Sequence, residues 1–256
     1  MVFFVFFQID GYSNYILSWS VMDVKNNVTI LKENILPVIR DHNNYMPNQL
    51  SMDGGMEFRL TEYALQLYSH THRVDYSRTA VVRGTSRQNH PIERLWRDVN
   101  EKITFKLKWA FRDMESQRLI DMSVAKDKFV VGHLFRTMVK YGLGIFVPSF
   151  NSRNVGGGSR IPELLRLHNT IPATPLTPLP SAEDFADIFV AEGHSLTRPR
   201  VPVHLDVGPE LLQLLFDVHS DNCREAYSHA VNNNYTEFSA IIMDVIASVG
   251  LWVLLS

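Results

Sequence analysis

The chain has 256 residues, of which 45% are hydrophobic, and a formal net charge of −2. This apolar content can fill a core of domain size, which excludes a chain that is disordered throughout. The single cysteine, Cys223, excludes an internal disulfide framework and any zinc site built from several cysteines of one chain. These properties favour a reducing compartment, so we expect a nuclear or cytoplasmic protein.

Charge is distributed unevenly along the chain. Residues 1–160 carry 21 Lys and Arg against 15 Asp and Glu, a net of +6, whereas residues 161–256 carry 4 against 12, a net of −8. Residues 73–112 alone carry 10 basic and 4 acidic side chains. This concentration predicts a phosphate-binding surface in the first half of the chain and a different kind of partner for the second half.

Two apolar stretches need to be weighed as membrane segments. The opening MVFFVFFQI has no basic flank and is too short to span a bilayer, so it is interpreted as a buried strand. The closing stretch 240–255 is 16 residues long and contains Asp244, which favours a core helix. We therefore predict no membrane anchor.

The first predicted elements form a hairpin followed by a helix. Apolar residues run from Val2 to Ile9, a turn follows at 10–13, and residues 15–21 resume at strand spacing. Asn26 is suited to cap a helix in which Pro37 predicts a kink. The apolar positions of this helix recur at three- and four-residue steps, namely Val28, Leu31, Ile35 and Ile39.

The next predicted elements alternate between strand and helix. A short strand over 49–52 runs into Asp53-Gly54-Gly55, a helix follows over 56–68, and a second short strand covers 79–82. A long helix then begins around Pro91. Its apolar face comprises Ile92, Trp96, Val99, Ile103 and Leu107, while Glu93, Arg97, Asn100 and Lys108 lie beside or opposite it. This order predicts a mixed sheet with helices packed on it.

Glycine and proline mark the predicted boundaries. Residues 156–159, GGGS, form a break, and 170–180 contains prolines at the spacing of an extended polyproline linker. Helical patterns follow over 181–192, 208–231 and 235–255. We predict a core domain over 1–165, a proline-rich linker over 166–180 and an acidic helical extension over 181–256.

Two carboxylates occupy positions of chemical interest. Asp53 follows a strand and precedes two glycines, which bring no side chains to cover it. Glu93 lies in the first turn of a helix, where the helix dipole stabilises an anion by about 0.3–1 kcal/mol. Taken separately, each has an ordinary structural explanation, a turn former for Asp53 and a helix cap for Glu93.

Three segments together carry a family resemblance: QIDGYSNYI at 8–16, SMDGGMEF at 51–58 and SRQNHPIERLWRD at 86–98. They resemble segments of the catalytic core of retroviral integrases and DDE transposases, most closely the integrase core domains carried by genes of eukaryotic transposon origin. The resemblance covers residues 1 to about 165. It implies an α/β, ribonuclease H-like fold in which a mixed sheet is flanked by helices, followed here by a C-terminal α-helical extension.

The resemblance also implies a chemistry. In that family three carboxylates hold two divalent ions, normally Mg²⁺ (or Mn²⁺), for in-line attack on a phosphate of DNA. By position, Asp53 matches the second carboxylate and Glu93 the third. Arg87, Arg94 and Arg97 are then candidates for contacts with DNA phosphates. DNA is the implied partner.

The first carboxylate of that triad has no clear match. The segment holding Asp10 resembles the second strand of the family, so the missing acid is expected about 10–20 residues earlier, before Met1. We therefore expect an N-terminally truncated core with impaired metal chemistry, and we interpret Asp10 as a turn former. Asp23 and Glu57 are interpreted as solvated or supporting residues.

Two functions follow from this pattern and stay open. One is a DNA strand-transfer enzyme lineage that uses Mg²⁺. The other is a non-catalytic, domesticated module that binds nucleic acid through its basic region or an unidentified protein through its acidic extension. Self-association is compatible with both.

Three further features receive structural interpretations. His70 and His72 are expected in an exposed loop, because no third metal ligand lies nearby in the sequence. The glycines of 156–158 lack the Lys of a phosphate-binding loop. Trp96 and Trp109 are expected in the core or an interface rather than in base stacking.

Overall fold

The computed structural model describes residues 3–22, 24–84, 90–154, 160–167, 171–197 and 209–255, without the side chains of residues 90, 126, 209–218 and 249–255. Contacts between residues divide the chain into two compact units. We call Phe4–Glu93 with Phe150–Arg200 the sheet unit, and Met1–Phe3, Arg94–Ser149 and Val201–Ser256 the helical unit. Each is described by itself.

The sheet unit begins with the predicted hairpin. Strand β1 (Phe4–Ile9) pairs antiparallel with β2 (Ile16–Met22). In the connection, Asp10 Oδ2 accepts hydrogen bonds from the Ser13 backbone N–H at 2.8 Å and from Ser13 Oγ at 2.5 Å, and Asn14 adopts a φ of 60°. The hairpin is confirmed, and Asp10 stabilises its turn.

A helix with an internal π turn follows the hairpin. It consists of α1 (Asn27–Ile30), the π-helical turn Leu31–Ile35 and α2 (Leu36–Asp41). Asn26 caps α1, since its Oδ1 accepts from the Thr29 N–H at 2.8 Å. Pro37 stands in the first turn of α2 and has no N–H to donate, so the irregular turn lies immediately before it.

The second pair of strands is short and parallel. Strand β3 (Leu50–Met52) pairs with β4 (Val81–Arg83), with Ser51 opposite Val82. Between them lie the 3-10 turn Met56–Phe58 and the helices α3 (Arg59–Leu67) and α4 (Ser69–His72).

The sheet arrangement differs from the prediction of one mixed sheet. Among the described residues, the antiparallel pair β1–β2 and the parallel pair β3–β4 are two separate sheets. The chain is α/β as predicted, but its described strands share no ladder of backbone hydrogen bonds across the two pairs. Strand patterns identify strands; the partner of an edge strand is decided by tertiary contacts.

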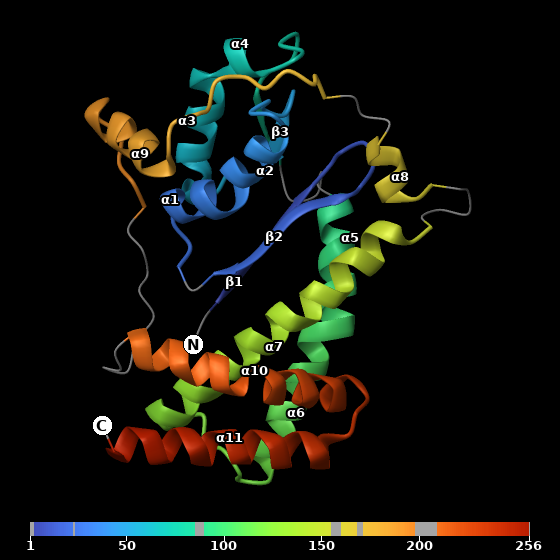
Figure 1. Ribbon diagram of the computed structural model, residues 1–256, viewed down its shortest axis with the longest axis vertical. Helices are drawn as coiled ribbons and strands as arrows, with labels where there is room; N and C mark the ends of the chain where they lie inside the picture. The colour runs from blue at the N-terminus through green and yellow to red at the C-terminus, as the bar shows by residue number, and fades with distance from the viewer. Residues whose placement is uncertain are drawn as a thin grey trace. The chain divides into compact units, whose positions relative to one another are not determined.

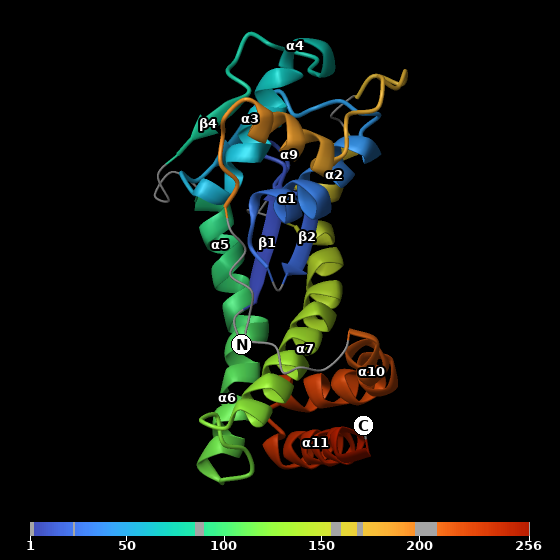
Figure 2. The same ribbon diagram turned by 90° about the vertical axis from the view of Figure 1, so that its left-hand side faces the viewer.

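Residues after the proline-rich segment complete the core of the sheet unit. Helix α9 (Ala182–Ala191) begins with a capping box formed by Ser181 and Asp184. Its Phe185 is fully buried in one apolar cluster together with residues of α1 and α3. Figures 1 and 2 show α9 beside α1 and α3.

The proline-rich segment is itself attached to the sheet unit. Asn43 Nδ2 donates to the Pro172 carbonyl at 3.0 Å, and the Leu176 N–H donates to the Asn43 carbonyl at 2.9 Å. Asn44 Nδ2 donates to the Leu176 carbonyl at 3.0 Å. Asn43 and Asn44 both have positive φ, 56° and 63°, a conformation that asparagine tolerates. The extended backbone predicted here is therefore held by specific hydrogen bonds.

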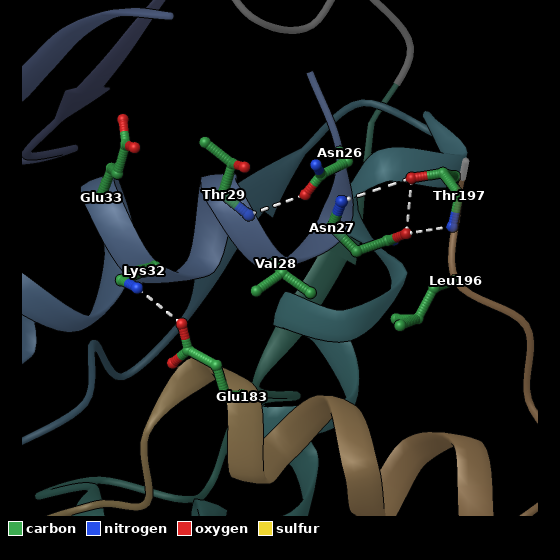
Figure 3. Close-up of a pocket in the computed structure, with 9 residues that line it drawn as sticks. All are labelled: Asn26, Asn27, Val28, Thr29, Lys32, Glu33, Glu183, Leu196 and Thr197. Carbon is green, nitrogen blue, oxygen red and sulfur yellow. Dashed lines mark hydrogen bonds and ion pairs between the residues drawn. The ribbon is translucent and has the colours of Figure 1, made fainter. Parts of the chain in front are cut away.

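A third attachment lies at the start of α1, beside an open cavity of about 510 Å³ (Figure 3). The buried Asn27 accepts hydrogen bonds at Oδ1 from the Thr197 backbone N–H at 2.5 Å and from Thr197 Oγ1 at 2.6 Å. Its Nδ2 donates to the Met56 carbonyl at 2.9 Å. Nearby, Lys32 Nζ pairs with Glu183 at 2.6 Å on the surface.

These contacts give a stability prediction. Asn27→Ala is expected to destabilise the sheet unit by about 1–3 kcal/mol, because Thr197 and Met56 lose a buried hydrogen-bonding partner. Urea unfolding followed by circular dichroism measures the change. Lys32→Ala is the matched control, since it removes an exposed ion pair from the same cavity and should change the midpoint little. Equal effects of the two substitutions would contradict this account.

The helical unit is built from long helices. Helix α5 (His90–Val99) continues through the π turn Asn100–Thr104 into α6 (Phe105–Ser116), and α7 covers Ala125–Ser152. In the C-terminal part, α10 (Pro209–Val231) and α11 (Tyr235–Leu255) lie side by side (Figures 1 and 2).

Aromatic pairs join the C-terminal helices to the rest of this unit. Phe111 of α6 meets Phe238 of α11 edge to face, with ring centroids 5.2 Å apart. Tyr141 of α7 meets Tyr227 of α10 in the same way at 5.4 Å. A Cβ on Gly142 would lie 2.7 Å from the Tyr227 hydroxyl, so the glycine permits this close approach.

The two compact units do not coincide with the predicted division of the chain into core, linker and extension. Helix α8 (Pro162–Leu167), the proline-rich segment and α9 belong to the sheet unit, whereas α10 and α11 belong with α6 and α7. The boundaries at 165 and 180 stay predictions about sequence segments. The predicted break at 156–158 lies outside the described residues.

By length and composition alone, one helical stretch of the described chain, Asp127–Ser152, would be long and apolar enough to cross a bilayer. Half of it is buried inside the protein, and a core helix passes the same test.

Candidate metal and nucleic-acid site

Asp53 lies where the sequence places it, directly after β3. Its side chain is exposed, and its Oδ1 accepts a hydrogen bond from the Gly55 N–H at 3.2 Å. A Cβ on Gly54 would meet no atom within 4 Å, so the glycine leaves open space beside the carboxylate. The hydrogen bond within the turn accounts for the position of one carboxylate oxygen of Asp53. Because the side chain is exposed, a cation could still reach the carboxylate.

Strand β4 ends at the same edge. The Gly84 N–H donates to the Met52 carbonyl at 3.0 Å, which extends the β3–β4 pairing by one bond. The chain therefore leaves β4 beside the residue that precedes Asp53. Arg83, the last residue of β4, forms an ion pair with Glu62 of α3 and so ties this edge to the helix.

Glu93 lies in the first turn of α5, and its side chain is exposed. This is the placement that the helix-start pattern predicts, with Pro91 in the same turn. Arg94 and Arg97 are exposed on the same helix, and Arg97 follows Glu93 by one turn. Arg87 lies outside the described residues. The family resemblance implies that the carboxylates of Asp53 and Glu93 lie near one another, and this stays a prediction.

Carboxylate oxygens are ligands that Mg²⁺ prefers, and Asp53 and Glu93 both carry an exposed carboxylate. Within the part of the chain that the structure describes, no group of three or more His, Cys, Asp or Glu side chains is placed to hold a metal ion. Asp53 and Glu93 are two acids, one fewer than the three carboxylates that the family resemblance implies.

Two other acids near these elements are engaged elsewhere. Asp10 is held in its hairpin turn by Ser13. Glu57 forms an ion pair with Lys25. Partial burial raises the pKa of Glu57, but the hydrogen bond from Lys25 and the backbone N–H of Glu57 itself outweigh burial and hold that pKa below its ordinary value. Asp23 lies outside the described residues.

The expectation of exposed loop histidines holds only for the exposure of His70. Both histidines lie in α4 rather than in a loop, and His72 is 3% exposed. Its Nε2 donates to the Thr177 carbonyl at 2.9 Å, and its Nδ1 lies 2.8 Å from Thr71 Oγ1. His72 therefore holds the proline-rich segment, and spacing along the chain could not reveal a partner 105 residues away.

The expectation that the tryptophans lie in the core or an interface is wrong for Trp109 as far as the core is concerned, and an interface stays a prediction. Trp96 is partly buried, whereas Trp109 is 51% exposed on α6. The basic residues on both sides of Trp109 are the sequence signal that could have indicated a solvent-facing role.

Comparison with known proteins gives one match. A family model described as an integrase core domain matches residues 2–170 of the 256. No curated protein and no solved structure matched the chain.

Proposed function

The chain belongs to the integrase core domain family, and on that premise we propose that it binds DNA and carries an integrase-like metal site centred on Asp53 and Glu93. The observation that supports the site is the pair of exposed carboxylates at the two predicted element ends, after β3 and in the first turn of α5. Three segments that resemble DDE transposases support a transposon-derived origin.

Integrase cores generally use divalent metal ions, which activate a nucleophile and stabilise the leaving oxygen during attack on a phosphate. In this chain Asp53 and Glu93 would hold the ion. Arg87, Arg94 and Arg97 would bind DNA phosphates and position the strand. Rigid elements position both acids, Asp53 through its turn with Gly55 and Glu93 through α5.

We further propose that the chemistry is impaired. Two carboxylates are too few to place both ions for in-line displacement, and the described residues supply no group of three. This observation favours the second function as well, a module that keeps DNA binding without efficient catalysis. We propose a nuclear or cytoplasmic location.

The DNA contacts are testable by salt dependence. Arg94→Ala combined with Arg97→Ala is expected to weaken binding to duplex DNA and to lower the slope of log K against log salt by about 2, because each phosphate contact releases counterions. Fluorescence anisotropy with the full chain over several salt concentrations measures both quantities. Arg118→Ala with Arg153→Ala is the charge-matched control. An unchanged slope would remove the α5 arginines from the DNA interface.

A further inference from the structure

Helix α6 presents two aromatic rings to solvent. Phe105 is 40% and Trp109 is 51% exposed, and their rings stack with centroids 6.5 Å apart at an interplanar angle of 28°. The two residues are one turn apart, so their side chains lie on the same face of the helix. Large exposed aromatic side chains that adjoin one another commonly mark a binding surface.

The opposite face of α6 fixes the helix in place. Leu107, Ala110, Phe111 and Met114 are buried, and Phe111 packs against Phe238. The exposed rings are therefore held on a rigid support, which lowers the entropy lost when a ligand binds.

Basic side chains flank the two rings along the helix, and two of them lie close to the rings. Residues 102–112 contain Lys102, Lys106, Lys108 and Arg112 and no acidic residue. The Lys106 ammonium lies 6.0 Å from the Trp109 ring centroid, and that of Lys108 lies 5.9 Å from the Phe105 centroid. Among the described residues, none of these four cations forms an ion pair.

We propose that this aromatic and basic surface of α6, defined by Phe105, Trp109, Lys108 and Arg112, binds single-stranded nucleic acid. Bases would stack on the two rings while the cations contact the phosphates on either side. Stacking tolerates any base, because every base has a π face, and an interleaved arrangement of rings and cations is how proteins hold single strands without reading their sequence.

Two features favour a single strand over other ligands. In a duplex the faces of the bases are already stacked on one another, so the rings would gain nothing from duplex DNA. A docking protein helix would be expected to need exposed aliphatic side chains, but the only large apolar residues that are exposed on α6 are the two aromatic ones. An acidic peptide would pair with the cations but would bring no π face to stack on the rings.

This proposal goes beyond the site at Asp53 and Glu93, and it does not depend on it. The arginines proposed to bind duplex DNA lie on α5, before the π turn at 100–104, whereas the aromatic pair lies after it. The two surfaces can therefore be tested by separate substitutions.

The test is an anisotropy titration of the full chain with labelled (dT)20 and with a duplex of the same length. Phe105→Ala combined with Trp109→Ala is expected to weaken (dT)20 binding at least about tenfold, since stacking contributes about 1–3 kcal/mol per base. Duplex binding should change less than about twofold. Trp109→Phe keeps a ring at this position and should retain most of the affinity.

Tyr12→Ala combined with Tyr76→Ala is the control, because these tyrosines are exposed aromatic residues outside α6, at 67% and 62%. The expected result is wild-type affinity for both probes. Unchanged (dT)20 affinity in the α6 variant would overturn the proposal, as would an equal loss for the two probes. Binding of a polyglutamate peptide that the α6 substitutions abolish, with (dT)20 binding intact, would assign the surface to an acidic protein instead. The double variant Arg94→Ala and Arg97→Ala should bind (dT)20 with wild-type affinity, even where it binds duplex DNA more weakly.

Discussion

Phe185→Ala is expected to destabilise the sheet unit by about 3–5 kcal/mol, because it removes a fully buried aromatic side chain from a close-packed core. The Phe185 ring meets Tyr68 edge to face, with centroids 5.6 Å apart. It belongs to the same buried cluster as Ile30 and Leu60, so the cavity would open in the centre of the unit. A loss of this size is a large fraction of the stability of an ordinary domain.

Hydrogen exchange measured by mass spectrometry on the full chain suits this prediction, since it reports the opening of α1 and α3 separately from the helical unit. Val190→Ala on the same helix is the control: Val190 is 51% exposed, and its truncation should change stability by no more than about 0.5 kcal/mol.

A chain ending at residue 165, the predicted domain boundary, should lose protection against hydrogen exchange throughout α1 and α3. Normal protection in that truncated chain would show that the core does not need α9.

The second large effect concerns the metal. Glu93→Gln and Asp53→Asn are each expected to weaken Mn²⁺ binding at least about tenfold, because each removes a charged oxygen ligand while keeping the shape of the side chain. Electron paramagnetic resonance of free Mn²⁺ measures the affinity. DNA binding without metal should stay within about twofold of the wild type, since neither carboxylate is placed to bind a phosphate directly.

Glu57→Gln is the matched control, because Glu57 lies four residues from Asp53 but is already paired with Lys25. Its Mn²⁺ affinity should equal that of the wild type. In a plasmid nicking assay the unaltered chain should show little Mg²⁺-dependent activity, because two acids cannot position two ions. Robust nicking that disappears in Asp10→Asn would instead make Asp10 a ligand and contradict its assignment to the turn. Wild-type Mn²⁺ affinity in both Glu93→Gln and Asp53→Asn would reject the proposed site.

Local patterns predicted most of the described elements well. The hairpin, the cap at Asn26, the short strands β3 and β4, and the helices at 182–191, 209–231 and 235–255 all begin within a few residues of their expected positions. The 28-residue helix α7 was not predicted. It contains Gly142, Gly144 and Pro148, which weaken the helical pattern, and its apolar residues are spread around the helix rather than along one stripe.

The sequence also predicted correctly which residues stand at the ends of strands and helices. Asp53 follows its strand and Glu93 opens its helix because turn chemistry and helix capping act over a few residues. The family resemblance, carried by three short segments, agrees with the match over residues 2–170. The chemistry proposed for the two acids therefore rests on local sequence.

The sequence by itself determined most of the strands and helices, with the exception of α7, and the positions of Asp53 and Glu93 within them, because these depend on interactions between near neighbours. Three short segments were also enough to indicate the family. Only the tertiary structure decided that the segment around Leu176 docks on Asn43 and Asn44, that His72 is buried, and that Trp109 faces solvent. These outcomes depend on which apolar faces meet. Segments more than 100 residues apart supply the partners, and no periodicity within either segment specifies the other.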